Sequence, residues 1–182
     1  MGAGRTEFAM SLFGCLTPTN DSELVVKGES IKIKNPRQAI ESGIGYVSED
    51  RKRYGLVLRQ NIKKNMSLAS MDSMARFGAI NKNLEITTAQ QYVNDLRIKA
   101  RNIDQTAETL SGGNQQKVIL SKWILTKPDI LILDEPTRGI DVGAKFEIYQ
   151  IMNKLAKQGV AIIMISSELP EILGMSNRIY VM

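Results

Sequence analysis

Two short stretches of the chain carry residues that could do chemistry on a phosphate. The first, Leu110–Gln115, reads LSGGNQ and comes directly before a helix pattern whose apolar positions continue until Pro128. A helix start exposes unpaired N–H groups and the positive end of the helix dipole. Gly112 and Gly113 have no side chains that would keep an anion away from it. We therefore interpret Ser111 and the two glycines as a phosphate-binding helix start, although a Gly-Gly pair by itself is more often a flexible turn.

The second stretch places two carboxylates at the end of an apolar run. Ile130–Leu133 is wholly apolar, as is typical of a strand buried on both faces, and Asp134 and Glu135 follow it directly. In open parallel sheets, ligands bind beyond the carboxyl ends of the strands. Asp134 could therefore hold the Mg²⁺ of a nucleotide, and Glu135 could orient or deprotonate an attacking water. The alternative is an ordinary core strand that ends in an acidic turn.

The start of the chain matches the last part of a phosphate-binding loop, G-x-x-x-x-G-K-[ST]. The first glycine of that pattern and the strand before it are missing, so we expect a fragment of a longer protein, truncated at its N-terminus, rather than a truncated reading frame. Arg5 stands where the pattern has Lys, and its broad planar group does not replace a compact ammonium. The Thr6 hydroxyl could still meet Mg²⁺. The predicted nucleotide-binding residues are Gly2, Ala3, Gly4, Arg5, Thr6 and Glu7.

These motifs, in this order and at this spacing, resemble those of the ATP-binding cassette (ABC) ATPases. Leu110–Gln116 is similar to the signature motif of the family, Ile130–Glu135 to its Walker B strand with the catalytic glutamate, and Gly139–Asp141 to its D-loop. More narrowly, residues 114–118 and 135–145 are similar to the second ATPase half of the fused, two-cassette subunits of ribose- and galactose-type sugar importers. The resemblance runs nearly from end to end.

The resemblance implies roles for the remaining polar residues at the strand ends. Glu135 would be catalytic, and Glu49 takes the position of a family Gln that touches the metal. The implied Mg²⁺ ligands are thus Thr6, Glu49 and Asp134, with a charged surface loop as the alternative for Glu49. Ser167 takes the catalytic position of the family's switch histidine, and the chain contains no histidine. Because a Ser hydroxyl is too short to replace an imidazole, the alternative for Ser167, a cap for the following helix, is the stronger interpretation.

In this family, two cassettes enclose two ATP molecules, each held by the phosphate loop of one cassette and the signature of the other. The resemblance implies that this chain's signature completes the partner's site, whereas Arg5, Glu49 and Ser167 compromise the site on its own loop. We therefore expect low ATP hydrolysis from the isolated chain. The implied signature residues are Leu110, Ser111, Gly112, Gly113, Asn114 and Gln115, with Asp141 in the D-loop.

The implied function is the cassette of a ribose- or galactose-like monosaccharide importer that couples ATP binding and hydrolysis to transport. The implied cofactors are ATP and Mg²⁺. The implied partners are a second cassette, fused N-terminally, membrane permease subunits and, indirectly, a sugar-binding protein. The protein would then lie on the cytoplasmic face of the cell membrane, bound through the permease, and would bind no nucleic acid. The residues do not encode which sugar is carried.

Two other functions stay open, a non-hydrolysing regulatory cassette half and a soluble ABC ATPase that acts on ribosomes or nucleic acid. The second should show a long basic arm or a coiled coil, and the sequence has neither. The formal net charge of +5 is modest, and its clusters at 51–53 and 63–64 are typical of a solvated basic face. The single cysteine, Cys15, is expected to be a small core residue.

We expect the elements that must position these residues to form one α/β domain of 182 residues, and the resemblance implies a P-loop NTPase of the ABC cassette type. We expect a mostly parallel sheet with flanking helices and an antiparallel edge hairpin around Lys27–Glu29. The core would comprise 1–59 and 110–182. Residues 60–109 would form a helical subdomain whose methionines serve either as core filler or as a docking surface for the membrane subunit. Further expected elements are a helix over Thr6–Phe13, a helix that Asn35 and Pro36 open and Gly43 closes, strands Ile44–Val47 and Arg178–Val181, a buried strand Val160–Ile165, and a helix that Asp141 caps and Gly159 ends.

Overall fold

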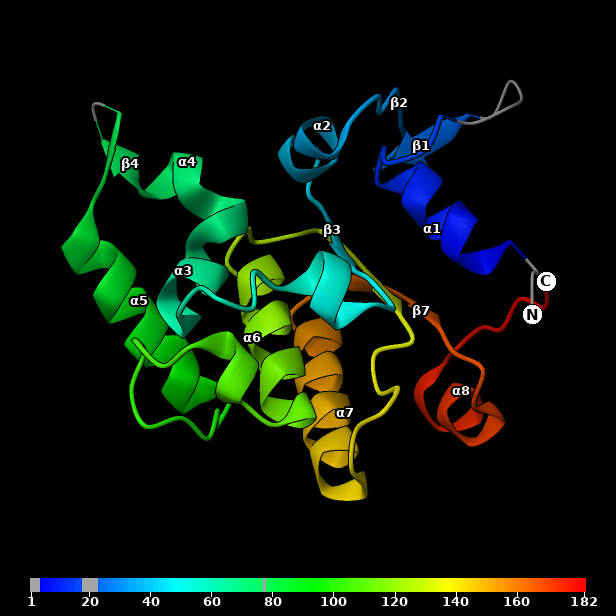
Figure 1. The fold of residues 1–182 in the computed structure, drawn as a ribbon. Helices are drawn as coiled ribbons and strands as arrows, with labels where there is room; N and C mark the ends of the chain where they lie inside the picture. Colours follow the sequence, from blue (N-terminus) through cyan, green and yellow to red (C-terminus); the bar gives the residue numbers. More distant parts are fainter. Residues whose placement is uncertain (1–3, 18–22, 77) are drawn as a thin grey trace.

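A parallel sheet of three strands lies at the centre of the computed structural model (Figure 1). The structure describes residues 4–17, 23–76 and 78–182. Because neighbouring strands pair in parallel, their carboxyl ends meet at one edge, and each strand runs there into a polar segment. In spatial order the sheet is built from β3 (Ile44–Val47), β6 (Ile130–Asp134) and β7 (Ala161–Ile165).

Helices cover both faces of this sheet. Figure 1 shows α1 (Arg5–Leu12) above the sheet, and α6 (Gly112–Ile124) and α7 (Val142–Lys157) below it. The α7 helix is capped at its start by the Asp141 side chain and is followed by Gly159 at φ 92°, a conformation that favours glycine. The predicted α/β architecture with flanking helices is confirmed.

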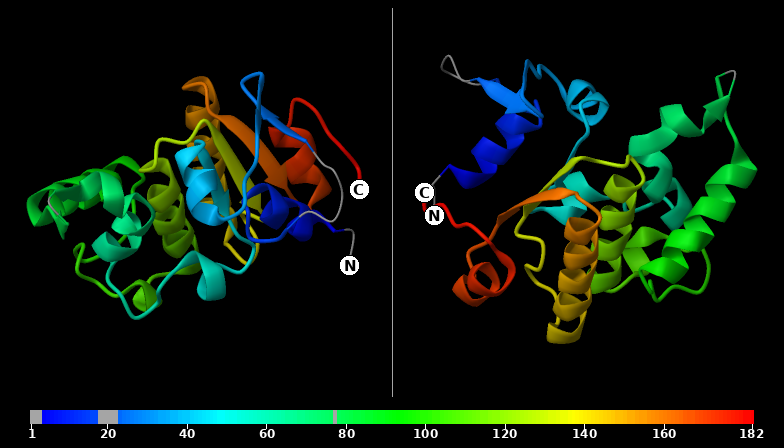
Figure 2. Two further views of the ribbon diagram at one scale, coloured as in Figure 1. Left: turned by 90° about the horizontal axis from the view of Figure 1, so that it is seen from above. Right: turned by 180° about the vertical axis from the view of Figure 1, so that it is seen from behind.

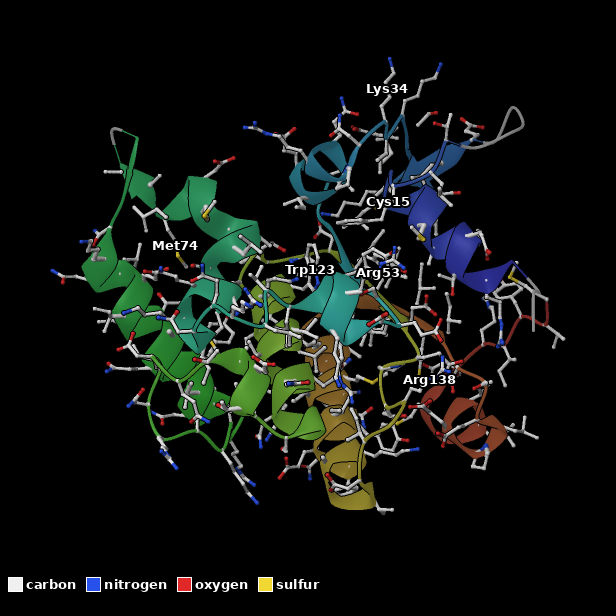
Figure 3. The ribbon with its side chains drawn as sticks, in the orientation of Figure 1. Cys15, Lys34, Arg53, Met74, Trp123 and Arg138 are labelled. Atoms are coloured by element: carbon white, nitrogen blue, oxygen red, sulfur yellow. The ribbon has the colours of Figure 1, made fainter. Side chains whose placement is uncertain are left out.

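An aromatic cluster joins the elements on the two faces of the sheet. The ring of Phe13, just after α1, lies 5.5 Å from the ring of Tyr46 on β3 and 5.3 Å, edge to face, from the ring of Trp123 on α6. All three side chains are buried, and Figure 3 shows Trp123 in the interior between α6 and β3. Edge-to-face pairs contribute about 0.5–1.5 kcal/mol beyond the area that they bury. This cluster therefore helps to hold α1 against the sheet.

The predicted hairpin forms, but it does not extend the central sheet. Strands β1 (Leu24–Val26) and β2 (Glu29–Ile31) pair only with each other among the described residues, and Lys27 and Gly28 at the turn have φ values of 54° and 83°. The helix α2 (Pro36–Glu41) follows, and the Asn35 side chain caps it by accepting from the Gln38 amide at 3.0 Å.

Residues 51–109 form a mainly helical lobe beside the sheet, shown from two further sides in Figure 2. The helix α3 (Ile62–Ser67) contacts α5 (Lys82–Asp95) within the lobe and α6 of the core, so it ties the lobe to the core. A short antiparallel pair, β4 (Ala75–Arg76) and β5 (Ala79–Ile80), interrupts the helices, and the sequence does not predict it. Within the described part of the chain, no helix is long and apolar enough to cross a membrane. The elements are η1 (Arg51–Gly55), α3 (Ile62–Ser67), η2 (Leu68–Ser70), α4 (Met71–Met74), β4 (Ala75–Arg76), β5 (Ala79–Ile80), α5 (Lys82–Asp95) and η3 (Ala107–Thr109).

Three expectations about burial and the chain's last segment are wrong. Cys15 is exposed rather than part of the core. β7 is exposed on one face, with Ile163 37% exposed, because it is the last strand of the described sheet. The expected strand Arg178–Val181 does not form, and the chain is irregular after α8 (Leu169–Met175). An apolar run forms a strand only where a partner strand takes up its backbone hydrogen bonds.

A buried lysine makes the stability of this fold depend on pH. The Lys122 ammonium on α6 is 5% exposed and donates to the Gly55 carbonyl at 2.6 Å, which anchors the end of η1. Burial lowers the pKa of Lys122 to about 8 from its ordinary value of 10.5. Between these two pH values the unfolded chain keeps the proton that the folded chain has released. The free energy of unfolding should therefore rise with pH in this window, by at most about 3 kcal/mol.

Denaturant unfolding at pH 7 to 10.5 checks this expectation. Lys122→Met should remove the rise, whereas Lys127→Met, at an exposed lysine in the loop after α6, should retain it. Equal pH profiles for the wild type and Lys122→Met would show that Lys122 is not the group responsible.

Candidate functional site

Asp134 lies buried at the carboxyl end of β6, where the sequence predicts a metal ligand. One carboxylate oxygen, Oδ2, accepts a hydrogen bond from the Tyr46 hydroxyl at 3.2 Å. Burial raises the pKa of the Asp134 carboxyl, and the hydroxyls of Thr6 and Tyr46 and the charge of Arg5 oppose that rise. The structure thus brings Thr6, at the start of α1, beside Asp134 as predicted.

The other carboxylate oxygen of Asp134, Oδ1, is buried without a hydrogen-bond partner among the described residues. Buried carboxylate oxygens are rarely left unpaired, and a hard cation or its bound water would satisfy this one. The described residues contain no group of three or more His, Cys, Asp or Glu side chains that could hold a metal by themselves. Thr6 and Asp134 would therefore fit as two of the ligands of a Mg²⁺ ion, through a hydroxyl and one carboxylate, and the protein would not supply all of its ligands.

Glu135 and Ser167 meet at the same edge of the sheet. Glu135 has φ +48°, which is uncommon for a residue other than glycine, and its N–H donates to the Ile165 carbonyl at 2.9 Å. The Ser167 hydroxyl donates to the Glu135 carboxylate at 3.2 Å. The N-cap residue of α8 is Glu168, so the alternative in which Ser167 caps the next helix is wrong. A strained backbone at a chemically capable side chain is typical of functional sites.

The described part of the phosphate loop contacts this edge through Arg5. Its guanidinium Nη1 donates to the carbonyl of Ser166 at 3.0 Å, so Arg5 is engaged by the protein itself. Gly4 caps the start of α1 with φ 73°, a conformation that suits glycine, while Glu7 is exposed on the first turn. Gly2 and Ala3, the other predicted nucleotide-binding residues, lie outside the described residues.

The second cluster lies at the start of α6. Ser111 is the N-cap residue and is exposed, and its hydroxyl accepts from the Asn114 side chain at 2.8 Å rather than capping the helix. The Asn114 Oδ1 accepts from the Lys99 amide at 2.8 Å. Buried Gln115 donates to the Ala107 carbonyl at 3.1 Å, and Leu110 is also buried. The side chains of Ser111, Asn114 and Gln115 are thus fixed by the protein, and the role of this helix start in phosphate binding stays a prediction.

Arg51 places a positive charge beside Gly112. Its guanidinium donates to the carbonyls of Arg138 at 2.8 Å and Gly139 at 3.4 Å. A Cβ built on Gly112 would lie 3.0 Å from Nη2 of this guanidinium. The sequence showed Arg51 only as part of a basic cluster, because nothing local indicates that the segment after β3 reaches the loop after β6.

Gly113 serves a different purpose from its neighbour. A Cβ built on Gly113 would lie 2.5 Å from the Cβ of Ala144 on α7, closer than side chains tolerate. The start of α7 is fixed by Asp141, which accepts from the Ala144 amide at 2.9 Å. The α6 and α7 starts therefore approach closely only because Gly113 has no side chain. A hollow of about 210 Å³ lies there, lined by Lys99, Ser111, Gly113, Asn114, Lys117, Asp141, Gly143, Ala144 and Glu147.

Glu49 forms an ion pair with Arg138, the residue that Figure 3 labels in the loop that follows β6. Its role as a Mg²⁺ ligand stays a prediction. The structure thus collects Thr6, Asp134, Glu135 and Ser167 at the sheet edge. Figure 1 shows the signature turn at the start of α6 well away from α1, so the two predicted phosphate-binding clusters lie in different places on the chain.

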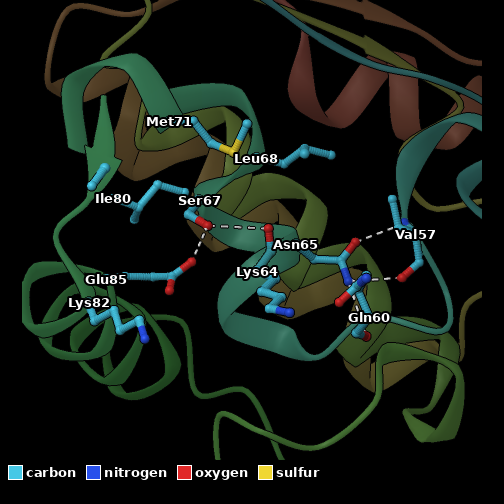
Figure 4. Close-up of a pocket in the computed structure, with 11 residues that line it drawn as sticks. Val57, Gln60, Lys64, Asn65, Ser67, Leu68, Met71, Ile80, Lys82 and Glu85 are labelled. Carbon is cyan, nitrogen blue, oxygen red and sulfur yellow. Dashed lines mark hydrogen bonds between the residues drawn. The ribbon is translucent and has the colours of Figure 1, made fainter. Parts of the chain in front are cut away.

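A cavity of about 570 Å³ opens in the helical lobe (Figure 4). Leu68 and Met71, each about two-fifths exposed, contribute apolar surface to it. Asn65 fixes one wall, since its side chain accepts from the Val57 amide at 2.8 Å and donates to neighbouring carbonyls. On the opposite wall, Ser67 donates to the Glu85 carboxylate at 2.6 Å. The lining residues are Val57, Gln60, Lys64, Asn65, Ser67, Leu68, Met71, Ala79, Ile80, Lys82 and Glu85.

Comparison with known proteins places this geometry in a family. The chain is 55% identical over its whole length to the xylose import ATP-binding protein of Thermoanaerobacter pseudethanolicus. It is 53% identical to the L-arabinose transport ATP-binding protein of Geobacillus stearothermophilus and 49% identical to the ribose import ATP-binding protein of Geobacillus kaustophilus. The chain spans 36% of the length of each of these relatives.

Solved structures share the fold. A nucleotide-free ATP-binding cassette from an ABC transporter superposes with a TM-score of 0.80 at 17% identity, covering 96% of this chain and 70% of that one. A dimeric bacterial ABC transporter cassette gives 0.76 at 18% identity, covering 93% and 72%. The family model for ABC transporters matches residues 1–138. The chain therefore belongs to the ABC transporter family and is an ATP-binding cassette of the ABC ATPase class.

Proposed function

We propose that this cassette drives the import of a monosaccharide by coupling ATP binding and hydrolysis to transport. The observation that carries the proposal is the start of α6, where Ser111 is exposed and Gly112 has no side chain, on a chain in which β6 ends in Asp134 and Glu135 follows. Relatives named for xylose, L-arabinose and ribose import, with 49–55% identity, support the substrate class. ATP-dependent uptake of labelled pentoses and hexoses by vesicles that contain the ATPase and its permease tests it.

The chain's own site would bind nucleotide through Gly2, Ala3, Gly4, Arg5, Thr6 and Glu7. Thr6, Glu49 and Asp134 would hold Mg²⁺, whose chemistry when bound is to neutralise charge on the phosphate oxygens. Glu135 would orient or deprotonate the attacking water, and Ser167 would orient the Glu135 carboxylate through its hydrogen bond. A fixed hydroxyl donor holds a carboxylate in one orientation, so less rearrangement is needed before it acts on the water.

We further propose an uneven division of labour between two cassettes. Leu110, Ser111, Gly112, Gly113, Asn114 and Gln115 would complete the partner's ATP site, with Asp141 at the same interface. The chain's own site would be degenerate, because Arg5, Glu49 and Ser167 replace the usual residues. The contact between Arg5 and the Ser166 carbonyl supports this, since the guanidinium spends a donor on the protein rather than on phosphate.

The isolated chain should consequently hydrolyse ATP barely above background. Its own loop is degenerate, and its signature has no second nucleotide to act on. Steady-state phosphate release at millimolar MgATP measures this, and we expect far less than about one turnover per second, the low end of the usual enzyme range. A rate near that value would contradict the division of labour.

The same Arg5 contact favours a second candidate, a regulatory cassette half that binds nucleotide without hydrolysing it. Retention of Glu135 with a fixed hydroxyl partner argues for residual hydrolysis. Glu135→Gln separates the two candidates in single-turnover hydrolysis of labelled ATP by the isolated chain, so that hydrolysis at the partner's site does not mask the result. A regulatory half would show no loss.

We propose that the lobe cavity binds the membrane permease. The protein would then lie on the cytoplasmic face of the membrane. Its further partners would be a second, fused cassette and, indirectly, a sugar-binding protein. Figure 4 shows Leu68 and Met71 beside the cavity. Replacing both with Gln should lower co-purification with the cognate permease at least about tenfold, because exposed apolar anchors dominate such contacts.

A matched control is Val25→Gln, which removes an exposed apolar side chain from β1 outside the lobe. Circular dichroism verifies that both variants fold. Unchanged co-purification of the Leu68 and Met71 variant would reject the assignment.

A further inference from the structure

Glu171, on α8, is a buried carboxylate that the proposed chemistry does not use. It is 4% exposed, and both of its oxygens accept hydrogen bonds from neutral hydroxyls. Oε1 accepts from Thr137 at 2.9 Å, and Oε2 accepts from Ser166 at 2.5 Å. Because burying a carboxylate is costly without such partners, both hydroxyls are needed where they are.

The two hydroxyls belong to the two loops that carry the proposed reacting residues. Thr137 lies two positions after Glu135, in the loop that leaves β6, and it is 1% exposed. Ser166 lies one position before Ser167, in the loop that leaves β7, and it is 4% exposed. Glu171 therefore bridges the two loops on either side of the contact between Glu135 and Ser167.

Ser166 also connects this bridge to the start of α8 and to Arg5. The Ser166 hydroxyl also accepts from the Glu168 amide at 3.0 Å, which fixes the entry into α8. The Ser166 carbonyl accepts from Arg5, the residue of the phosphate loop that contacts this edge. Displacing Ser166 would therefore disturb Arg5 and Ser167 together.

We propose that Glu171 is a positioning residue that holds the Glu135 carboxylate against the Ser167 hydroxyl by clamping the loops after β6 and β7. The inference rests on the proposed function only in giving Glu135 a catalytic role. The clamp itself is a property of the folded chain without nucleotide. Glu171 contacts neither reacting residue directly and acts through Thr137 and Ser166.

Two substitutions of Glu171 distinguish a clamp from simple packing. Gln has the same length, and its amide can accept from one hydroxyl and donate to the other, since hydroxyls do both. Leu fills similar space but leaves the hydroxyls of Thr137 and Ser166 buried without a partner. If Glu171 acts as a clamp, Gln should preserve the loop positions and Leu should not. If Glu171 only fills space, Leu should preserve them.

Amide hydrogen exchange on the full 182-residue chain, followed by NMR, is the test. The reporter is the Glu135 N–H, which donates to the Ile165 carbonyl, and the reference is the Leu133 N–H within the sheet. Glu171→Leu should speed exchange at Glu135 at least about tenfold relative to Leu133, because the loop opens locally while the sheet stays closed. Glu171→Gln should stay within about twofold of wild type.

Smaller variants keep the test valid if Glu171→Leu does not fold. Thr137→Val and Ser166→Ala each remove one hydroxyl and should each give part of the acceleration. Glu168→Gln, at an exposed carboxylate that pairs with Lys145, is the control and should change nothing. The inference is overturned if Glu135 and Leu133 accelerate equally in the Leu variant, or if Gln behaves like Leu. Failure of the proposed function would instead appear as unchanged hydrolysis in Glu135→Gln, which leaves the exchange result standing.

Discussion

In the assembled two-cassette ATPase, Gly112→Asp should lower ATP hydrolysis at the partner's site at least about a hundredfold, the usual cost of removing a phosphate- or oxyanion-binding group. Gly112 starts α6 without a side chain, so its N–H and the helix dipole can face an anion. The new carboxylate would occupy the anion's place and repel the phosphate. Nucleotide binding by the partner cassette should stay nearly intact, since its own phosphate loop is untouched.

The structure also indicates that this variant folds. A Cβ at Gly112 meets the Nη2 of Arg51 at 3.0 Å, the far end of a flexible side chain that can shift, and the added carboxylate can pair with that guanidinium. Gly112→Ala is the matched control, because it adds the Cβ without the charge and should lose much less activity. Circular dichroism and phosphate release are the measurements. Equal activities for the Ala and Asp variants would show that charge at this helix start is irrelevant.

Gly113→Ala should lower the free energy of unfolding by about 1–3 kcal/mol, the typical cost of forcing an extra methyl into a packed contact. The new Cβ would lie 2.5 Å from the Cβ of Ala144, so α6 and α7 would have to move apart. Denaturant unfolding measures the loss. We thus propose different roles for the adjacent glycines, Gly112 in binding an anion and Gly113 in the close approach of two helices.

A compensating substitution makes the Gly113 expectation specific. Ala144→Gly removes the methyl that Gly113→Ala would strike, so the double variant should recover most of the stability relative to Ala144→Gly alone. Additive losses in the double variant would show that the contact with Ala144 is not the cause.

The helix and strand signals of this chain could be predicted because they are local. Asn35 and Asp141 cap α2 and α7 as expected, since a short side-chain acceptor beside the first turn needs no distant partner. The strand Ile44–Val47 and the run that ends in Asp134 also form as predicted. From these, the meeting of strand ends at one sheet edge follows directly.

The contacts between the loops at that edge could not be predicted. The sequence favoured Ser167 as a helix cap, but Ser166 accepts the Glu168 amide instead, which frees Ser167 to donate to Glu135. The sequence predicts Glu49 as a metal ligand or a surface residue. Its ion pair with Arg138 depends on how closely the loop after β3 approaches the loop after β6. Such pairings follow from tertiary geometry rather than from spacing along the chain.

The exposure of Cys15 and the irregular structure of Arg178–Val181 also could not be predicted from the sequence. Cys15 was expected in the core because cysteine is usually buried, yet it follows Gly14 at the end of α1 and faces solvent. Arg178–Val181 has strand-like residues, but no neighbouring strand of the described sheet pairs with it. Residue type indicates a preference for burial or for a strand, but the neighbouring elements determine whether the residue is buried or paired.

We propose that this cassette's signature completes the partner's ATP site while its own phosphate loop is degenerate. The most direct test compares ATPase rate and nucleotide occupancy for Gly112→Asp and Arg5→Ala in the two-cassette subunit assembled with its permease. We expect Gly112→Asp to stop turnover with occupancy nearly unchanged, and Arg5→Ala to lower occupancy on this cassette with a smaller effect on turnover. If Arg5→Ala stopped turnover and Gly112→Asp did not, this chain would be the catalytic half and the proposed division of labour would be wrong.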